Sequence, residues 1–554
     1  METYHAKIRL TAAVMLGVLL SVAPAGATEY YVSPTGSDAS AGTSPAEPFR
    51  SIDAAARAAR AGDVVTILPG VYEGRIRPSG SGTLEAPIVY RNAGGGEVVI
   101  TTSEATDGGP WTERFAFRLG AGNNHTVLEG LTFRDAEGWI YVGEYAHHTT
   151  IRDCTFDGSR MYHGIYVDSG SWTRIENCRF LRAIAYPPGW TPDDPEPTLA
   201  DYISIWRDSH HNLIDNCQFH EISHVAVCIM GHDPESVASK NIVRRCTFVE
   251  PRWKCVSFHS AADTLVEGCR MRGLAASYLQ YQGASAIVRR NVFVGYRPVR
   301  SEPHPAYFHG VLWLRSSVSE YGAMDLAQHG RIYHNTFIDC AVPVTYRGEG
   351  AVLPVVDNVF KNNLFHRFTT PLRLPKPFYR NFTVQEANPF VGNLLSDGPA
   401  DGTVFELIAR GEAAGDRLGL DEAVAASGEL CRRQVFIANR QGEAVFVDDA
   451  GGDYRPGAGS PAIDAGIDLT RTVDAGRGTE VVVEDARYFC DGYGLIPGDR
   501  IVIGDNAPVR ILDVDVAMRC LRVDRAVTWH KGDGVNLVYT GTAPDIGALE
   551  YEGR

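Results

Sequence analysis

The chain has 554 residues, of which 44% are hydrophobic, so it can bury a sizeable core and wholesale disorder is excluded. Its 52 Lys and Arg against 67 Asp and Glu give a formal charge of −15, which argues against a nucleic-acid binder with a basic face. Glycine (57) and aromatic residues (10%) are abundant while charged residues (21%) are few, a balance that favours strands and tight turns over surface helices.

Residues 1–27 have the pattern of a secretory signal peptide. Lys7 and Arg9 form a charged start, residues 11–24 a short apolar run, and Ala25-Gly26-Ala27 a small-residue cleavage site. An N-terminal membrane anchor is the alternative, but the run is short for a bilayer and no later stretch approaches ~20 apolar residues. The sequence therefore predicts a secreted protein, periplasmic or extracellular, with no membrane attachment after removal of the signal and in a compartment that permits disulfides.

The beginning of the mature chain predicts a cap. Residues 29–34 and 63–68 have the composition of strands, and Ser51 is placed to cap a short Ala-rich helix at residues 52–60. Such a helix would cover the open end of a solenoid core.

A three-residue motif then recurs nine times. It ends in an apolar residue at Phe133, Phe156, Phe180, Phe219, Phe248, Met271, Phe293, Phe337 and Phe365, and its first position is Leu131, then Cys at 154, 178, 217, 246 and 269, then Asn at 291, 335 and 363. The shortest spacings cluster at 22–24 residues, and the longer ones indicate inserted loops.

Each repeat holds short strands with alternating polarity, bounded by Gly, Asn, Asp and Ser, and has no room for a helix as well. The consistent fold is all-β: a right-handed parallel β-helix over residues 28–400, in which equivalent positions stack ~4.8 Å apart. The Cys column would then be a stack of buried thiols and the Asn column a hydrogen-bonded ladder. Disulfides between neighbouring coils are the alternative, and a straight column cannot form a tetrahedral metal site.

The remaining segments differ in character. Residues 401–445 look like a partly helical excursion, with the helical part at 403–430. Residues 446–554 are expected to close the chain, and the turn signals in residues 478–541 predict a small β subdomain inserted late in the sequence.

A face for ligands follows from aligning one strand per coil on its inward apolar pair, from Ile140 and Val142 to Val311 and Trp313. The outward residues form three columns, the first being Gly138, His163, Asp201, Val225, Lys254, Ser277 and His309, the second Tyr141, Tyr166, Ser204, Cys228, Ser257, Gln280 and Leu312, and the third Gly143, Asp168, Trp206, Met230, His259, Gln282 and Leu314. This composition favours a cleft walled by the loops at 187–199 and 298–308, although the rings could simply cover the sheet.

Two ends of the mature chain carry a family resemblance. The segment Tyr30-Tyr-Val-Ser-Pro through Pro69-Gly-Val-Tyr72, and the closing Ser460-Pro-Ala-Ile-Asp-Ala-Gly466 and Pro544-Asp-Ile-Gly-Ala-Leu-Glu550, resemble secreted β-helix proteins of the pectate-lyase-like superfamily. That family includes polysaccharide lyases, glycoside hydrolases, epimerases and proteins with no assigned activity, so the resemblance implies a fold and a carbohydrate ligand rather than one reaction.

Lyase chemistry needs a base beside a carboxylate and a cation to hold it. We predict His163, Asp201, Lys254 and His259 as the catalytic candidates, with substrate contacts from Tyr166, Asp168, Trp206, Arg252, Gln280 and Gln282. Lys254 and His259 lie about 16 Å apart along one strand, so only one can act on a given bond. Where the chondroitinase B and alginate lyase branch carries Asn-Lys-Ser and Arg-His-Gly, this chain has Phe258-His259-Ser260 and Tyr281-Gln282-Gly283, so that branch's mechanism is not simply inherited.

Two alternatives stay open. A glycoside hydrolase needs paired carboxyls, which the columns lack and which a loop acid (Asp193, Asp194, Glu196 or Asp233) could complete. A non-catalytic polysaccharide-binding or surface protein is the other. No cofactor or metal is predicted: calcium would suit loop carboxylates, but no dense Asp cluster stands out. The expected partner is a polysaccharide, with no nucleic acid, and the chain is expected to be a monomer.

Overall fold

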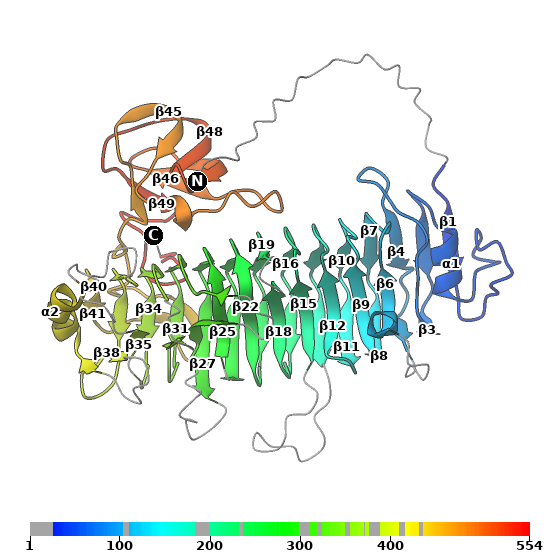
Figure 1. The fold of residues 1–554 in the computed structure, drawn as a ribbon, viewed down its shortest axis with the longest axis horizontal. Helices are drawn as coiled ribbons and strands as arrows, with labels where there is room; N and C mark the ends of the chain where they lie inside the picture. The colour runs from blue at the N-terminus through cyan, green and yellow to red at the C-terminus, as the bar shows by residue number, and fades with distance from the viewer. Residues whose placement is uncertain are drawn as a thin grey trace, which may run out of the picture.

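The structure, a computed structural model, describes residues 26–102, 110–182, 200–231, 236–275, 277–298, 310–318, 324–348, 355–370, 372–375, 388–408, 416–431 and 436–553. The predicted signal peptide and the predicted loops at 187–199 and 298–308 fall almost entirely outside these ranges. In the described residues, three long sheets of mainly parallel strands run along the molecule, and each coil in its middle part gives one strand to each sheet in turn (Figure 1). This topology fits the predicted right-handed parallel β-helix.

The first sheet has fourteen strands in the described residues. They are β1 (Glu29–Val32), β2 (Val64–Ile67), β4 (Ile88–Asn92), β7 (Thr126–Glu129), β10 (Thr150–Arg152), β13 (Arg174–Glu176), β16 (Leu213–Asp215), β20 (Ile242–Arg244), β23 (Leu265–Glu267), β26 (Ile287–Arg289), β30 (Arg331–Tyr333), β33 (Val359–Lys361), β36 (Phe390–Val391) and β40 (Phe436–Ile437).

The second sheet carries the nine-fold motif. Its strands are β3 (Gly70–Glu73), β5 (Val98–Thr101), β8 (Thr132–Ala136), β11 (Thr155–Ser159), β14 (Arg179–Arg182), β17 (Gln218–His220), β21 (Thr247–Val249), β24 (Arg270–Ala275), β27 (Val292–Pro298), β31 (Thr336–Ile338), β34 (Leu364–His366), β37 (Leu394–Ser396) and β41 (Arg440–Gln441).

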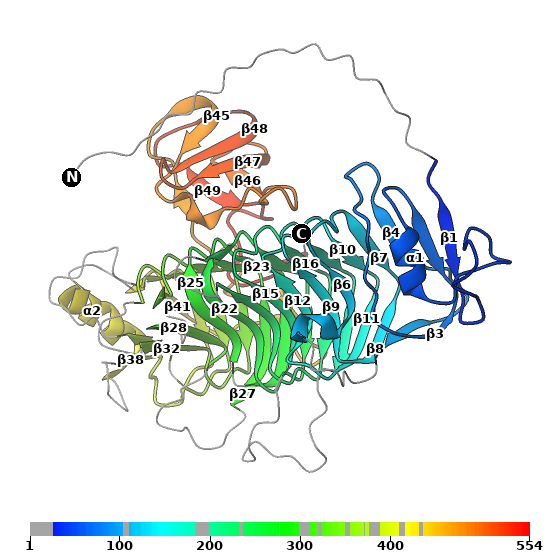
Figure 2. The ribbon, with the colours of Figure 1, turned by 45° about the vertical axis from the view of Figure 1, so that its right-hand side comes forward.

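The third sheet holds the predicted ligand face. Its main strands are β6 (Phe115–Leu119), β9 (Gly138–Gly143), β12 (His163–Asp168), β15 (Asp201–Trp206), β18 (Val225–Met230), β22 (Lys254–Ala262), β25 (Ser277–Ala284) and β28 (Leu312–Val318), with β19 (Ala238–Ser239), β29 (Met324–Asp325) and β32 (Val344–Gly348) at its margins. Figure 2 shows β9, β12, β15 and β22 side by side along the solenoid.

Short elements sit at the two ends of the solenoid. Helix α1 (Ile52–Ala58) begins where the Ser51 hydroxyl accepts the Ala54 N–H at 3.1 Å, and it buries Ile52, Ala55 and Ala56 as the predicted cap does. At the other end lie β35 (Leu372–Pro375), β38 (Phe405–Ile408), β39 (Asp416–Leu418) and helix α2 (Leu420–Cys431). A 3₁₀ turn at Trp111–Arg114 precedes β6.

Stacked rings fill the solenoid core. The motif residues of successive coils lie ring on ring, with centroids 4.8 Å apart for Phe156 and Phe180 and 4.7 Å for Phe180 and Phe219. All of these phenylalanines are buried. Identical residues in successive coils therefore meet each other, and every coil buries its own apolar residue against its neighbours.

The Cys and Asn columns form one continuous line beside these rings. The ten described cysteines are free, and all but Cys520 are buried. In the Asn part, Asn335 donates from Nδ2 to Asn363 Oδ1 at 3.0 Å, and the pattern continues beyond the predicted members to Asn393 and Asn439. The predicted hydrogen-bonded ladder is confirmed and is two coils longer than the motif indicated.

The late β subdomain is a closed sheet. Its strands are β44 (Thr470–Arg471), β45 (Gly476–Val482), β46 (Arg500–Ile503), β47 (Val509–Asp515), β48 (Cys520–Trp529) and β49 (Gly534–Leu537), with a 3₁₀ turn at Ala486–Tyr488. A bridge from Thr472 to Val483 joins the two ends of the strand order, so we call it the barrel. Before it lies the hairpin β42 (Phe446–Asp448) and β43 (Asp453–Pro456).

The chain enters and leaves the barrel at one place. The Gly466 N–H donates to the Pro544 carbonyl at 2.8 Å and the Ile546 N–H to the Ala462 carbonyl at 2.9 Å. The two family-like closing segments thus pair with each other on the solenoid and hold the barrel as an insertion between them.

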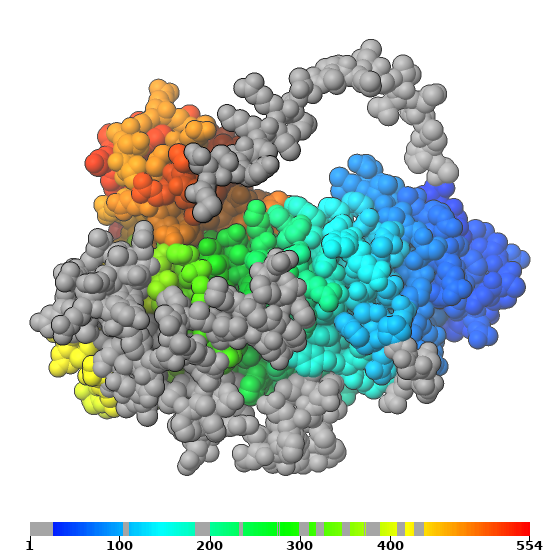
Figure 3. All heavy atoms as spheres, in the orientation of Figure 1, coloured from blue at the N-terminus to red at the C-terminus, as the bar shows by residue number. Residues whose placement is uncertain are grey.

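An apolar stripe on the outer side of the first sheet explains where the barrel sits. Leu213, Ile242, Leu265 and Ile287 are register partners in successive strands and pack into one cluster with the barrel's apolar residues. Figure 3 shows the barrel, in orange and red, lying directly on the coils. Exposed to water, this stripe would cost roughly 25 cal/mol per Å².

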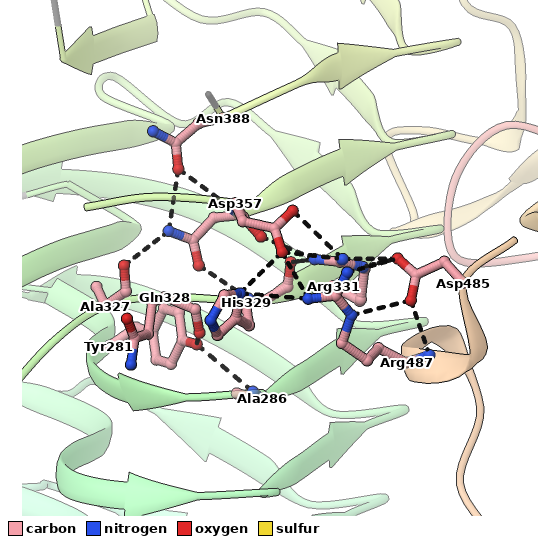
Figure 4. Close-up of polar contacts among 12 residues, drawn as sticks. Tyr281, Ala286, Ala327, Gln328, His329, Arg331, Asp357, Asn388, Asp485 and Arg487 are labelled. Carbon is pink, nitrogen blue, oxygen red and sulfur yellow. Dashed lines mark hydrogen bonds and ion pairs between the residues drawn. The ribbon is translucent and has the colours of Figure 1, made fainter. Parts of the chain in front are cut away.

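Buried ion pairs flank the stripe (Figure 4). Arg331, 1% exposed, contacts Asp485 of the barrel at 2.6 Å and Asp357 of the next coil at 3.3 Å, while Arg487 of the barrel contacts Asp357 at 2.6 Å. His329 also contacts Asp357, at 2.8 Å. Each charge therefore has an opposite partner across the interface, as burial requires.

Candidate functional site

The pairing of the third sheet tests the predicted columns. His163 pairs with Asp201, and Val225 with Lys254, while Trp206, Met230, His259 and Gln282 follow one another in the third column. The predicted register is therefore confirmed from β9 to β25.

The register of the last coil was wrong by one residue. Gln280 pairs with Trp313, not with Leu312, and Leu312 and Leu314 face the core. The cause is the corner before β28, where Val311 also points inward, so that three apolar residues compete for the two inward positions. Trp313 consequently lies on the outer side.

The outward columns are polar yet buried. Ser204, Ser257 and Gln280 are fully buried, and Asp201 is 1% exposed. A buried polar group costs stability unless it is hydrogen-bonded, so the bonds among these residues define the site.

A chain of hydrogen bonds runs across three coils. His163 Nδ1 lies 2.8 Å from the Ser204 hydroxyl, which donates to Asp201 Oδ2 at 3.1 Å, and Asp201 Oδ1 lies 2.7 Å from Nδ1 of His224. Burial lowers the pKa of His163 to about 4, so this imidazole is neutral at pH 7. His163 is thus linked to Asp201 through Ser204.

His224 was missed by the sequence reasoning, as was Tyr162. Both stand one residue before the first column, at the corner where the chain enters the third sheet, and the alignment started one position too late to include them. Between their coils the same position holds Ala200, and the Tyr162 hydroxyl lies 3.4 Å from His224 Nδ1. Tyr162 is 40% exposed and the His224 side chain 19% exposed, so a ligand can reach both.

Aromatic rings surround His163. The ring centroids of Tyr166, Tyr162, Trp206 and Trp111 lie 4.5, 4.7, 5.3 and 5.9 Å from that of the imidazole. Tyr166 is buried and Trp111 is 42% exposed. The predicted members Tyr166 and Trp206 are therefore together with His163, while Trp111, from the 3₁₀ turn, is an addition.

Asp168 lies beside this group and is held by a cation. Its carboxylate accepts two 2.8 Å bonds from Arg207 and one of 3.4 Å from the Tyr141 hydroxyl. Its charge is thereby neutralised, which suits a structural carboxylate.

Lys254 is adjacent to His224. Its backbone N–H donates to the His224 carbonyl at 2.8 Å, and its ammonium lies 5.7 and 5.8 Å from the ring centroids of Trp253 and Trp313. Both distances are within cation–π range. Arg252, two residues before, is exposed. The structure thus brings Lys254 to the same corner as His224 and Asp201.

His259, Gln280 and Gln282 form a separate group farther along the strands. His259 Nε2 lies 2.8 Å from the Ser257 hydroxyl and 3.5 Å from Gln280 Nε2, and Gln280 also contacts Gln282. As predicted from their spacing, Lys254 begins β22 and His259 lies five residues farther along the same strand.

Other features of the described residues lie away from this face. Among the described residues, no group of three or more His, Cys, Asp or Glu is arranged to hold a metal ion. The loop acids Asp193, Asp194, Glu196 and Asp233 fall outside the described ranges. A cavity of about 520 Å³ lies in the last coils, lined by residues that include His366, Arg367 and Asp449, and it contains none of the predicted site residues.

Comparison with known proteins gives few matches in sequence. No protein-family model matches the chain. It is 33% identical over 139 residues to the uncharacterized protein YwoF of Bacillus subtilis (strain 168), a match that spans 23% of this chain and only 28% of that relative.

Solved structures that are similar to this chain have low sequence identity to it. XylC in complex with xylose is 12% identical with a TM-score of 0.47, covering 92% of this chain and 100% of that chain. Pectate lyase Pel9A is 15% identical with a TM-score of 0.41, covering 94% and 96%. The parallel sheets fit the predicted β-helix architecture, and the reaction has to be argued from the site.

Proposed function

We propose that this protein is a secreted carbohydrate-active β-helix protein that cleaves an acidic polysaccharide by β-elimination. The observation that carries the proposal is the buried Asp201 carboxylate 2.7 Å from His224, with the Tyr162 hydroxyl beside the same ring. Lys254, whose backbone bonds to that of His224, is the proposed cation for the sugar carboxylate.

The contact with Asp201 selects the base. Because the carboxylate accepts Nδ1–H, the neutral His224 ring keeps its lone pair on Nε2. A carboxylate in this position also stabilises the imidazolium that forms when Nε2 takes a proton. His224, rather than the predicted candidate His163, is the proposed base, since His163 is buried and its Nδ1 is bonded within the protein.

The proposed elimination moves two protons and one electron pair. His224 removes the proton on the carbon next to the sugar carboxylate, whose developing charge Lys254 offsets. The electron pair forms the ring double bond as the glycosidic oxygen leaves, and the Tyr162 hydroxyl gives that oxygen its proton. The imidazolium then releases its Nε2 proton to solvent, the Tyr162 phenolate takes a proton from solvent, and the site is reset.

The two carboxylates in the predicted columns, Asp168 and Asp201, do not favour hydrolysis. Retaining or inverting glycosidases need two carboxyl groups about 5–9.5 Å apart that are open to the substrate. Asp168 is bound by Arg207, and Asp201 is 1% exposed between two donors. Exposed rings such as Trp111 would instead provide stacking surfaces for sugars.

Secretion is part of the proposal. It depends on the signal-like residues 1–27 and on the fold. No described helix has the length and apolar character to cross a membrane. The protein is proposed to act as a monomer, with a polysaccharide as its partner.

Incubation with a panel of uronate and neutral glycans tests the proposal. A lyase yields an unsaturated product that absorbs in the ultraviolet, a hydrolase yields new reducing ends without that absorbance, and a binding protein is retained on a glycan gel without product. The expected result is absorbance with a uronate polymer only.

Matched variants then test the base. His224→Ala should lower kcat by ~10² or more, whereas His530→Ala, a barrel histidine with an 86% exposed side chain, should not change it. Full activity of His224→Ala would refute the proposed base.

A further inference from the structure

The site contains two groups that the proposed reaction does not use, Ser204 and His163. Both are buried, at 0% and 9% exposure, and both belong to the hydrogen-bond chain that ends on His224. Neither can touch a substrate directly through the bonded atoms. Their role must be exerted through Asp201.

The number of available protons decides which atom donates and which accepts in each of these three hydrogen bonds. The Asp201 carboxylate only accepts, so it takes Nδ1–H from His224 on one oxygen and the hydroxyl proton of Ser204 on the other. The single Ser204 proton is thereby committed, so the Ser204 oxygen must accept from His163 Nδ1–H at 2.8 Å. One arrangement of protons satisfies all three contacts.

We infer that Ser204 and His163 are positioning residues that set the tautomer and the proton affinity of His224 through Asp201. The Ser204 hydroxyl stabilises part of the carboxylate charge, and His163 holds that hydroxyl in the orientation that points its proton at Asp201. Less charge is then left to attract the His224 proton, which keeps the ring able to release it.

Burial makes this control effective. Asp201 is 1% exposed and Ser204 0% exposed, so water cannot replace a missing donor. Hydrogen bonds to charged groups in such surroundings are stronger than between neutral groups. The lowered pKa of His163 agrees with its assignment as a neutral donor.

Titration of His224 by NMR, in protein with labelled histidine, tests the inference without any substrate. Ser204→Ala removes the donor to Asp201 and should raise the proton affinity of His224 about tenfold. His163→Phe should act in the same direction by freeing the hydroxyl, whereas His163→Asn, whose amide can donate in place of Nδ1–H, should restore most of the wild-type value.

The sheet offers a matched control. Ser257 occupies the column of Ser204 two coils on, is equally buried, and contacts His259 instead of an acid. Ser257→Ala should leave the His224 titration unchanged. Ser204→Thr, which keeps the hydroxyl, should retain the wild-type titration if Ser204→Ala fails to fold.

An unchanged His224 titration in folded Ser204→Ala, an equal shift in Ser257→Ala, or a ¹⁵N spectrum that places the wild-type His224 proton on Nε2 would overturn the inference. Its catalytic meaning rests on the proposed function, and the two fail separately. If Ser204→Ala leaves the His224 titration unchanged while the protein is an active lyase, the positioning role of Ser204 and His163 is rejected. If the titration shifts but the protein has no lyase activity, the proposed lyase function is rejected.

Discussion

His163 combines an ionisable ring with almost complete burial. Four aromatic rings surround it and its Nδ1–H is committed to Ser204, so protonation would place a charge where water cannot solvate it. The pKa of about 4 follows from this burial. A group whose folded-state pKa is depressed below that of the unfolded chain makes stability depend on pH.

The free energy of unfolding should fall on acidification because of His163. Below pH 6.5 the unfolded chain binds the proton while the folded protein excludes it until pH 4 is approached, so this contribution to stability is present above pH 6.5 and lost across that window. Urea unfolding at pH 7 and pH 4.5 should lose about 2 kcal/mol more in the wild type than in His163→Asn. The exposed His530→Asn should behave like the wild type, and equal losses in all three proteins would contradict the assignment.

Lys254 and His259 should have separable effects on activity. Lys254 shares the corner of His224, whereas His259 lies five residues along the strand among Ser257, Gln280 and Gln282. Lys254→Ala should reduce kcat by ~10² or more, and His259→Ala should mainly raise KM. Steady-state kinetics on the cleaved glycan measure both, and the reverse assignment would move the proposed reaction to the group around His259.

At the scale of the element, each coil is stabilised by contacts with the equivalent residues of the neighbouring coils. The rings of Phe156, Phe180 and Phe219 stack in line, and the amides of the Asn column bond from coil to coil. Cys and Asn fill the same corner in successive coils, but the thiol contributes mainly packing and the amide contributes bonds to backbone and side chain.

Alanine substitutions in this column should separate the two contributions. Asn335→Ala removes the donor to Val288 O and the acceptor of the Asn291 amide, leaving buried groups unsatisfied, so it should cost about 3–5 kcal/mol. Cys246→Ala removes one buried sulfur from the equivalent corner and should cost about 1–2 kcal/mol. Chemical denaturation measures both, and equal losses would mean that the amide ladder contributes no more than packing.

At the scale of the molecule, the barrel and the solenoid complete each other. The stripe of Leu213, Ile242, Leu265 and Ile287 needs a cover, and Arg331 needs the barrel's Asp485 to balance its charge. Burial at this interface lowers the pKa of Lys361 to about 8. The Lys361 ammonium donates to the carbonyl of Leu469, at the start of the barrel, at 3.0 Å. The interface is therefore a permanent part of the fold.

Breaking the interface charge pair should destabilise the whole protein. Asp485→Ala leaves the buried Arg331 with one carboxylate partner, Asp357 at the longer distance of 3.3 Å, which predicts a loss of about 3–5 kcal/mol. Asp513→Ala, an exposed barrel residue 3.9 Å from Arg522, should cost less than 1 kcal/mol. Thermal unfolding followed together with limited proteolysis measures both. A wild-type unfolding curve for Asp485→Ala would show that the barrel is not needed by the solenoid.

Most of the fold could be read from the repeat because, in a coil of short strands, each motif residue meets its own counterpart one coil away. The inward and outward assignment of His163, Asp201, Lys254 and His259 followed from that rule alone.

The site itself depended on the corners between strands, where the alternation of inward and outward side chains does not apply. Only the tertiary structure brings Tyr162 and His224 together across Ala200, inserts Ser204 between His163 and Asp201, and turns Trp313 outward after a corner with an extra inward residue. The cover of the first sheet was equally beyond the sequence pattern, since an apolar stripe indicates that something packs on it, while the partner that does so, some 250 residues later in the chain, is selected by shape and charge in three dimensions.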